Sequence, residues 1–361
     1  MSLRFLTAGE SHGPALVGLL DGLPAGLRLS EDAIAADLAR RQRTHGRSGR
    51  QNIEKDRARI LGGLVRGRTT GAPVALMIEN LDYANWIGVE VPPNRVPRPG
   101  HADLAGCLKW GFDDTRMVSE RASARETAMR VALGAVAKAL LAEAGVRVLG
   151  ETAAIGAVQS LRPARSPAAV DRSPVRCGDA RASAAMIRAI DRAKASGETL
   201  GGAVRVTAFG VPAGLGSSAQ WDRRLDGRIA QALMSVPSVK GVEIGDAAWQ
   251  ARSVGSRAQD AIRRGFARPT NHAGGIEGGM TNGQSVVAKA WLKPISTLRK
   301  GLPSVDLRTG RAARAAYQRS DACVVPAAAV IAEAMLAWVL ADALLERFGA
   351  DRVSDLRRAL R

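Results

Sequence analysis

Short apolar runs broken by glycine and by polar turns recur along the chain, and most of them are too short for helices. Runs of this length, rich in β-branched residues and often alternating with polar positions, are typical of strands, whose successive side chains point to opposite faces. The predicted strands cover residues 3–8, 17–21, 60–65, 74–78, 146–158, 201–211 and 285–292.

Apolar residues spaced three and four apart predict the helices. The predicted helices cover residues 31–42, 123–145, 182–196, 225–235 and 326–348. Ser30 is a good N-cap for the first of them. Pro326 and Gly349 mark the two ends of the last one. Polar, Gly-rich or Pro-rich stretches predict loops over 40–50, 80–100 and 162–179.

Strands and helices mix without strict alternation, and no repeat or low-complexity linker divides the chain. We therefore expect an α+β fold in which residues 1–361 form one domain of packed sheets and helices. The run 324–345 is long enough to cross a bilayer, but it contains Glu333 and Asp342, which favours a buried helix over a membrane span. We expect no signal peptide, because residues 1–7 are too short an apolar stretch.

The charge distribution bears on which ligands the protein binds, and the cysteines bear on metal sites, disulfides and cellular compartment. The net charge is +18, yet 44 of the 52 basic residues are arginines and they are dispersed along the sequence. Such a distribution favours small anionic ligands, together with coding bias, over nucleic acid. Cys107, Cys177 and Cys323 stand singly, which argues against a zinc site or a disulfide framework and favours a reducing cytoplasm.

The stretch "ERASARETAMRVA" (120–132) poses a question about charge. Ser123 and Glu126 have the spacing of a capping box, so the sequence predicts that a helix begins here. Arg121 and Arg125 would then lie at the positive end of that helix dipole, where cations are disfavoured. We expect an anion between these two arginines.

Histidines and further arginines gather in similar loops. His12 in "GESHG" and His101 in "RPGHAD" are flanked by glycine and charged residues, and imidazole can donate a proton near neutral pH. The guanidinium groups nearby match phosphate and carboxylate geometry; they belong to Arg41, Arg47, Arg98 and Arg319. These residues indicate a polyanion pocket with histidine proton donors and a possible carboxylate base, and they do not name a reaction.

Other motifs favour structural interpretations. No phosphate loop, dinucleotide fingerprint or HExxH motif occurs, and "GLGSS" (214–218) is more typical of a turn. His45 lies in the basic loop, and His272 in "NHAGGIEGG" is expected to serve backbone geometry.

Seven segments, in order, resemble chorismate synthases along nearly the whole chain. They are "AGESHG" (8–13), "RPGHAD" (98–103), "ERASARETAMRVALGAVAK" (120–138), "GVPAGLG" (210–216), "SVKGVEIGD" (238–246), "NHAGGIEGGM" (271–280) and "DACVVPAAAVIAEAM" (321–335). The resemblance implies a β-α-β sandwich assembled as a homotetramer. It also implies loss of phosphate and a ring proton from 5-enolpyruvylshikimate 3-phosphate to give chorismate. The family requires reduced FMN, which we expect an external flavin reductase to supply.

The resemblance also implies residue roles. His12 would protonate the departing phosphate, His101 would protonate the reduced flavin, and Asp321 would help flavin N5 to take the ring proton. The implied FMN contacts are Arg121, Ala122, Ser123, Pro237, Ser238, Gly278, Lys293, Pro294, Ile295, Ser296, Thr297 and Arg319. The implied contacts to substrate or NADPH are Ser11, Arg41, Arg47, Arg98 and Arg125.

At "KPIST" (293–297), at "QRSDAC" (318–323) and at Pro237, this sequence differs from the residues that are commoner in the family. For Arg41 and Arg47, NADPH and substrate phosphate remain equal alternatives. A nucleic-acid-binding protein and a relative that has lost the activity are the competing hypotheses.

Overall fold

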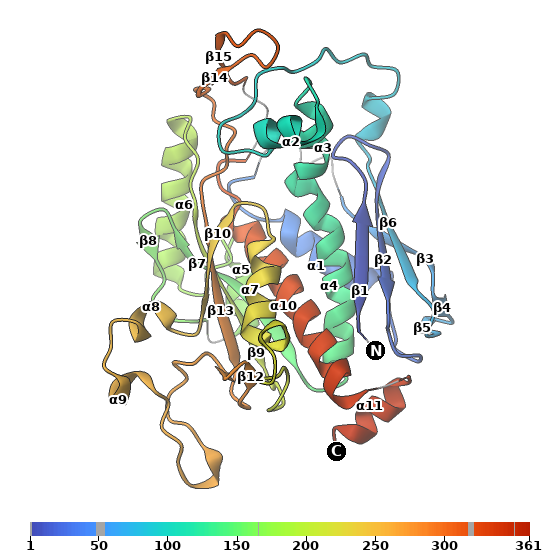
Figure 1. Ribbon diagram of the computed structural model, residues 1–361, viewed down its shortest axis with the longest axis vertical. Coiled ribbons are helices and arrows are strands. Elements are labelled where there is room, and N and C mark those ends of the chain that lie inside the picture. Colours follow the sequence, from blue (N-terminus) through green and yellow to red (C-terminus); the bar gives the residue numbers. More distant parts are fainter. Residues whose placement is uncertain (1, 48–54, 165, 317–320, 350) are drawn as a thin grey trace.

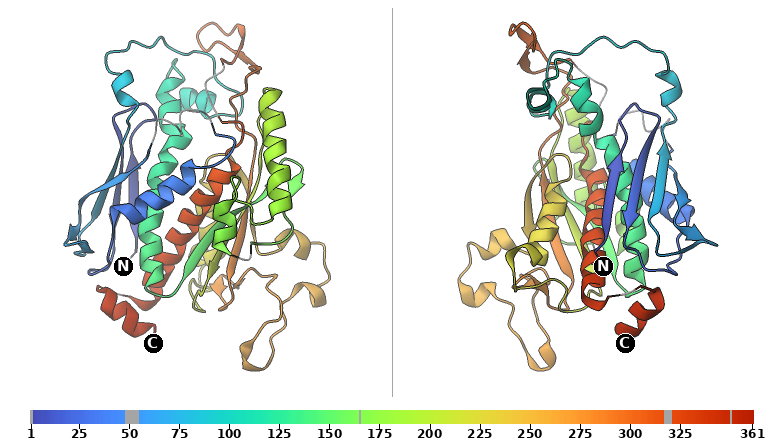
Figure 2. Two further views of the ribbon diagram at one scale, coloured as in Figure 1. Left: turned by 180° about the vertical axis from the view of Figure 1, so that it is seen from behind. Right: turned by 45° about the vertical axis from the view of Figure 1, so that its right-hand side comes forward.

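The computed structural model describes residues 2–47, 55–164, 166–316, 321–349 and 351–361. Two antiparallel sheets face each other across a layer of helices (Figure 1). The two further views show the first sheet, the helices and the second sheet as distinct layers (Figure 2). The α+β class and the β-α-β arrangement expected from the sequence are confirmed.

The first sheet has the order β1-β2-β6-β3 and only antiparallel neighbours. Its strands are β1 (Arg4–Ala8), β2 (Ala15–Asp21), β6 (Val74–Glu79) and β3 (Ala58–Gly62). Alternation decides which face is buried: Leu16 and Leu20 of β2 face the core, whereas Leu19 between them is exposed. This is the pattern from which the sequence predicted these strands.

The second sheet has the order β10-β13-β9-β7-β8 and is also antiparallel. Its strands are β10 (Val239–Ile244), β13 (Val286–Leu292), β9 (Gly202–Phe209), β7 (Arg147–Ile155) and β8 (Val158–Gln159). The sequence analysis missed β10, in which Lys240, Gly241 and Glu243 interrupt the apolar pattern.

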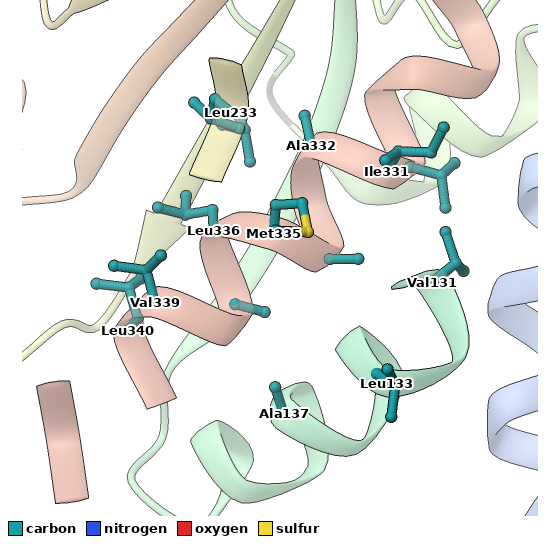
Figure 3. Packing of buried hydrophobic residues seen from close by; sticks show 14 of the residues in the cluster. Val131, Leu133, Ala137, Leu233, Ile331, Ala332, Met335, Leu336, Val339 and Leu340 are labelled. Atoms are coloured by element: carbon teal, nitrogen blue, oxygen red, sulfur yellow. The ribbon is translucent and has the colours of Figure 1, made fainter. Parts of the chain in front are cut away.

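Four helices fill the space between the sheets. They are α1 (Glu31–Gln42), α4 (Thr127–Ala142), α7 (Leu225–Met234) and α10 (Val325–Phe348). Helix α10 is long and apolar enough to cross a membrane, but 89% of its most apolar window is buried inside the protein. Side chains of α4, α7 and α10 interdigitate in the core (Figure 3).

Glycine allows α4 and α10 to approach closely. A Cβ atom built on Gly134 would lie 2.3 Å from the Cβ atom of Ala334 on α10. Any side chain at position 134 would therefore push the two helices apart.

Shorter elements complete the fold. The helices and 3₁₀ turns are η2 (Tyr83–Asn85), α2 (Asp103–Trp110), α3 (Arg116–Ala122), η3 (Ala124–Glu126), α5 (Pro167–Arg172), α6 (Ala180–Ala195), η4 (Trp221–Arg223), α8 (Ala247–Gln250), α9 (Gly255–Ala258), η5 (Arg264–Phe266) and α11 (Val353–Ala359). The strand pairs are β4 (Leu64–Val65) with β5 (Arg68–Thr69), β11 (Ile276–Glu277) with β12 (Met280–Thr281), and β14 (Pro303–Val305) with β15 (Ala312–Arg314).

Ser123 caps the helical segment over 124–142 as predicted, but that segment begins with a 3₁₀ turn and not with α-helix. Ser123 follows α3, and its hydroxyl accepts from the backbone N–H of Arg125 at 3.3 Å, so it caps the short turn η3. Helix α4 begins only at Thr127 and ends at Ala142, before Gly145. Glu126 does not complete a capping box with Ser123, because its carboxylate pairs with Arg130 at 2.9 Å.

Two other boundaries also differ from the prediction. The expected loop 162–179 contains the helix α5, and the first residues of the expected loop 40–50 are the last turn of α1. By contrast, Ser30 caps α1 as predicted, accepting from the backbone N–H of Ala33 at 3.2 Å.

A buried ionic network joins the helices of the middle layer. Glu333 on α10 is 1% exposed, and its carboxylate accepts from both terminal nitrogens of Arg40 at 2.7 and 2.9 Å. Lys138 of α4 and the backbone N–H of Gly150 also donate to it, at 2.7 and 2.8 Å. Asp37 accepts from Arg40 at 2.7 Å. One carboxylate therefore connects α1, α4, α10 and β7.

Opposing effects set the ionisation of Glu333. Burial by itself raises the pKa of this carboxyl, but Lys138 and Arg40 outweigh burial and lower the pKa to about 2. A lowered pKa in the folded state means that the carboxylate stabilises the fold above the unfolded value near 4.5. That stabilisation is lost as the pH falls towards 2.

We expect Glu333→Gln to lower the free energy of unfolding at pH 7 by about 3–5 kcal/mol, because it removes the buried negative charge that pairs with Arg40 and Lys138. Chemical denaturation followed by circular dichroism measures this loss. Glu346→Gln on the same helix is the control, since that side chain is 50% exposed and should cost little. Between about pH 4.5 and 2 the variant should lose less stability than the parent; equal losses would contradict the role of Glu333.

Candidate functional site

Helices α2 and α3 form a tight pair at one end of the helix layer (Figure 1). A Cβ atom on Gly106 of α2 would lie 2.4 Å from a methyl carbon of Val118 on α3, so only glycine permits this approach. The pair carries two carboxylates: Asp103 is the first residue of α2, and Glu120 lies in α3. Each of these carboxylates contacts one of the two histidines singled out in the sequence.

His12 lies in the loop between β1 and β2 and pairs with Glu120. The Nδ1 atom of its ring is 2.8 Å from Glu120 Oε1, and its backbone N–H donates to Glu120 Oε2 at 2.8 Å. The ring of Trp86 lies 4.4 Å away, centre to centre. The neighbouring hydroxyl of Ser11 accepts from Ser123 at 3.2 Å, so this loop meets the start of η3.

His101 makes a similar contact with Asp103, at 2.5 Å between Nδ1 and Oδ1. Arg98 donates to both oxygens of the same carboxylate, at 2.7 and 3.0 Å. Burial alone would raise the pKa of Asp103, but the hydrogen bonds from His101 and Arg98 lower it well below its ordinary value. Asp103 therefore remains a carboxylate that orients the imidazole.

The loop with His101 lies against the segment 293–297. Arg98 donates to the hydroxyl of Thr297 at 3.4 Å, and the ammonium of Lys293 donates to the carbonyl of Gly100. A Cβ atom on Gly100 would be 3.5 Å from the hydroxyl of Ser296. Two stretches almost two hundred residues apart are thus brought together.

The two arginines of "ERASARET" have different partners within the chain. Arg121 lies in the last turn of α3, where the helix dipole favours a cation, and it donates to the carbonyl of Thr7 at 2.8 Å. Arg125 is buried and pairs with Asp56 at 2.5 Å. The opposite oxygen of Asp56 lies 3.7 Å from Arg41. An internal carboxylate therefore serves Arg125, whereas Arg121 is held by the chain at β1. That both arginines face a bound anion stays a prediction.

A cavity of about 50 Å³ lies where several predicted residues converge. Its lining is Arg41, Arg47, Ala124, Thr127, Val236, Pro237, Ser238, Ile295, Val324, Ala327, Ala328 and Ile331. The N-terminal ends of α4 and α10 both border it, and helix N-termini favour anions. Two cations and two helix N-termini therefore border the cavity, and most of the remaining lining is apolar.

Arg47 and Ser238 give this cavity the character of a binding site. Arg47 pairs with Asp321 at 3.3 Å, and within the described part of the chain its buried Nε–H has no hydrogen-bond partner. Ser238 has a positive φ of 72°, a strained conformation for a residue other than glycine. Its carbonyl accepts from the backbone N–H of Lys293 at 2.9 Å, which links the cavity to the segment 293–297.

One predicted residue, Gly278, is not among the residues that surround this cavity. Gly278 lies in the turn between β11 and β12, which precede β13 along the chain, whereas Lys293 follows the end of that strand. The seven residues of β13 separate the two ends by ~20 Å. Arg319 lies outside the described residues. A larger hollow of about 260 Å³ near Lys138, Arg147 and Phe209 contains none of the predicted site residues.

Sequence reasoning missed the three carboxylates that hold the site. No role was assigned to Asp103 within "RPGHAD", although it stands two residues after the histidine, which is the only local signal for it. Glu120 and Asp56 lack even that signal, since their contacts join residues 108 and 69 positions apart. Trp86 belongs to a stretch to which the sequence analysis assigned no function.

Comparison with known proteins settles the family. A family model described as chorismate synthase matches residues 3–345. The chain belongs to the chorismate synthase family. It is 54% identical to a chorismate synthase of Rubrobacter xylanophilus and 51% identical to one of Solibacter usitatus, with 99% of this chain and 95% or more of each relative covered.

A solved structure agrees with this assignment. A crystal structure of chorismate synthase superimposes with a TM-score of 0.81 at 40% identity, covering 99% of this chain and 96% of the other. The resemblance seen in the seven sequence segments is confirmed. The chain is accordingly a lyase of the shikimate pathway that forms chorismate.

The close α2–α3 approach is open to a direct test. Gly106→Ala should lower the free energy of unfolding by about 1–3 kcal/mol, because the added methyl group overpacks the contact with Val118. The double variant with Val118→Ala should recover part of this loss in a double-mutant cycle. Gly227→Ala is the control, since a Cβ there meets nothing within 4 Å. Purely additive effects of the two substitutions would contradict the contact.

Proposed function

We propose that the chain converts 5-enolpyruvylshikimate 3-phosphate to chorismate and inorganic phosphate, with reduced FMN as an essential cofactor. The observation that carries the proposal is the convergence of histidine–carboxylate pairs with a cation-lined, partly apolar cavity in a chorismate synthase. The substrate bears two carboxylates and one phosphate, and FMN adds a second phosphate. A site for these molecules needs several cations and proton donors.

The residues around the cavity fit a flavin phosphate and its planar ring. The buried Nε–H of Arg47 lacks a partner within the described chain, which suits an incoming anion. Pro237, Ile295 and Ala327 provide apolar surface beside it. The enclosed cavity is smaller than a flavin, so the cofactor would extend over Arg121–Ser123 and over the segment 293–297. When bound, reduced FMN would supply the electron-rich environment that promotes loss of phosphate.

The proton-carrying groups have distinct places in this proposal. His12 would donate a proton to the departing phosphate, through the ring nitrogen that Glu120 does not hold. His101 would keep a proton next to the segment 293–297, on the cofactor side. Asp321, beside Arg47, would serve as the carboxylate that assists removal of the ring proton.

The arginines would bind and orient the anions. Arg98 shares Asp103 with His101, and Arg125 is tied to Asp56, so both guanidinium groups are held before any ligand binds. Arg41 and Arg47 line one cavity, which suits either a substrate phosphate or NADPH. Ser11 would add a hydroxyl donor beside His12.

We infer that the protein works in the cytoplasm as a homotetramer. We also infer that an external reductase keeps its FMN reduced, with NADPH as an indirect electron source.

Substitution of the two histidines tests the assigned roles. With reduced FMN and 5-enolpyruvylshikimate 3-phosphate, His12→Ala and His101→Ala should each lower turnover by about 10²–10⁴-fold, the usual contribution of a general acid. Phosphate release and chorismate absorbance measure turnover, and circular dichroism shows whether each variant folds. His272→Ala is the control, because that ring stacks on Trp249 outside the cavity and should leave turnover close to the parent. Near-normal turnover in both folded variants would refute the roles.

A further inference from the structure

We propose that Glu120 is a positioning residue that fixes the tautomer of His12, so that the ring gives up its proton from Nε2. The inference rests on the proposed role of His12 and concerns a residue outside the set expected from the sequence. Its basis is the double contact already described, in which the two oxygens of Glu120 lie 2.8 Å from His12 Nδ1 and from the backbone nitrogen of His12.

The chemistry of this double contact allows only one arrangement of hydrogens. A backbone N–H can only donate, and an ionised carboxylate can only accept. Since Oε2 accepts from the backbone of His12, Oε1 faces Nδ1, which must carry the hydrogen of that contact. In the neutral ring the other nitrogen, Nε2, is then the one without a hydrogen. Nε2 is therefore the site of the proton that makes the ring an acid.

The surroundings keep the ring in this orientation. The backbone N–H of Ser11 donates to the carbonyl of Glu120 at 3.1 Å. Asn80 donates to the carbonyl of Gly13 at 2.8 Å, which fixes the other side of the loop. The ring of Trp86 lies 4.4 Å from the imidazole, with the planes inclined at 49°. His12 thus has fixed backbone on both sides and an aromatic neighbour.

Glu120→Gln should invert the tautomer while leaving the shape of the side chain unchanged. Glutamine has one acceptor oxygen and one donor NH₂ group. Its oxygen must face the backbone N–H of His12, because that group can only donate. Its NH₂ group then faces Nδ1, which must accept and so cannot carry a hydrogen. The neutral ring would hold its hydrogen on Nε2. In the doubly protonated ring, Nδ1–H would lose the carboxylate oxygen that accepts from it.

The test combines a spectrum with kinetics. Protein labelled with ¹⁵N-histidine contains four imidazole rings, and the His12→Gln variant identifies the signals of His12. At pH 9, where imidazole is neutral in water, the parent should show Nδ1–H for His12 and the Glu120→Gln variant should show Nε2–H. In the turnover assay the variant should lose about 10²-fold in kcat with little change in KM, since the substituted group does not bind substrate.

Glu143→Gln is the matched control. That carboxylate follows the far end of α4 and pairs with Arg357, so its loss should change neither the His12 signals nor kcat. An unchanged His12 tautomer in Glu120→Gln would overturn the proposal. An inverted tautomer with full turnover would also overturn it, because the proton position would not matter to the reaction. The spectra need no substrate, whereas failure of the proposed function would appear as an inactive parent enzyme.

Discussion

The buried carboxylate of Glu333 is the interaction on which the arrangement of the middle layer depends. Helix α10 is apolar almost all round, so hydrophobic burial alone gives it little preference for one rotation about its axis. Glu333 removes this freedom, because a buried charge must meet Arg40 of α1, Lys138 of α4 and the backbone of Gly150 at once. The close approach of Gly134 to Ala334 fixes the separation of α4 and α10.

Fixing these helices also places the cations of the site. Arg40 binds Glu333 in the core, whereas Arg41, the next residue of α1, lines the cavity at the ends of α4 and α10. A shift of α1 would therefore disturb the core and the cavity together. The α2–α3 pair orients the histidines of the site, since its two carboxylates contact His12 and His101. The core and the site are thus connected through the adjacent residues Arg40 and Arg41 of α1, and the short helices α2 and α3 position the histidines.

The sequence predicted most of the regular structure because local pattern determines it. Alternation in β2 and β6, the serine cap of α1 and the apolar length of α10 are all local features, and all are confirmed. Ser123 is a cap as predicted, but its spacing to Glu126 could not reveal that the first turn is the 3₁₀ turn η3 or that α3 ends immediately before it. Lys240 and Glu243 concealed β10, whose pairing with β13 is a long-range contact.

The site was predictable as a set of residue types and not as a set of contacts. Histidines and arginines in Gly-rich loops indicated anion chemistry, and the family resemblance implied their roles. No local pattern connects Glu120 to His12 or Asp56 to Arg125, because the fold alone brings these residues together. The carboxylates that orient the site therefore became visible only in the structure.

An anaerobic reaction of the purified protein with 5-enolpyruvylshikimate 3-phosphate and FMN is the decisive experiment for the proposed activity. Chorismate absorbance and inorganic phosphate are followed together, once with chemically reduced flavin and once with oxidised flavin. We expect both products to appear in equal amounts with reduced FMN and neither product to appear with oxidised FMN. Equal turnover with oxidised flavin, or no turnover from folded protein that binds reduced flavin, would refute the proposed reaction.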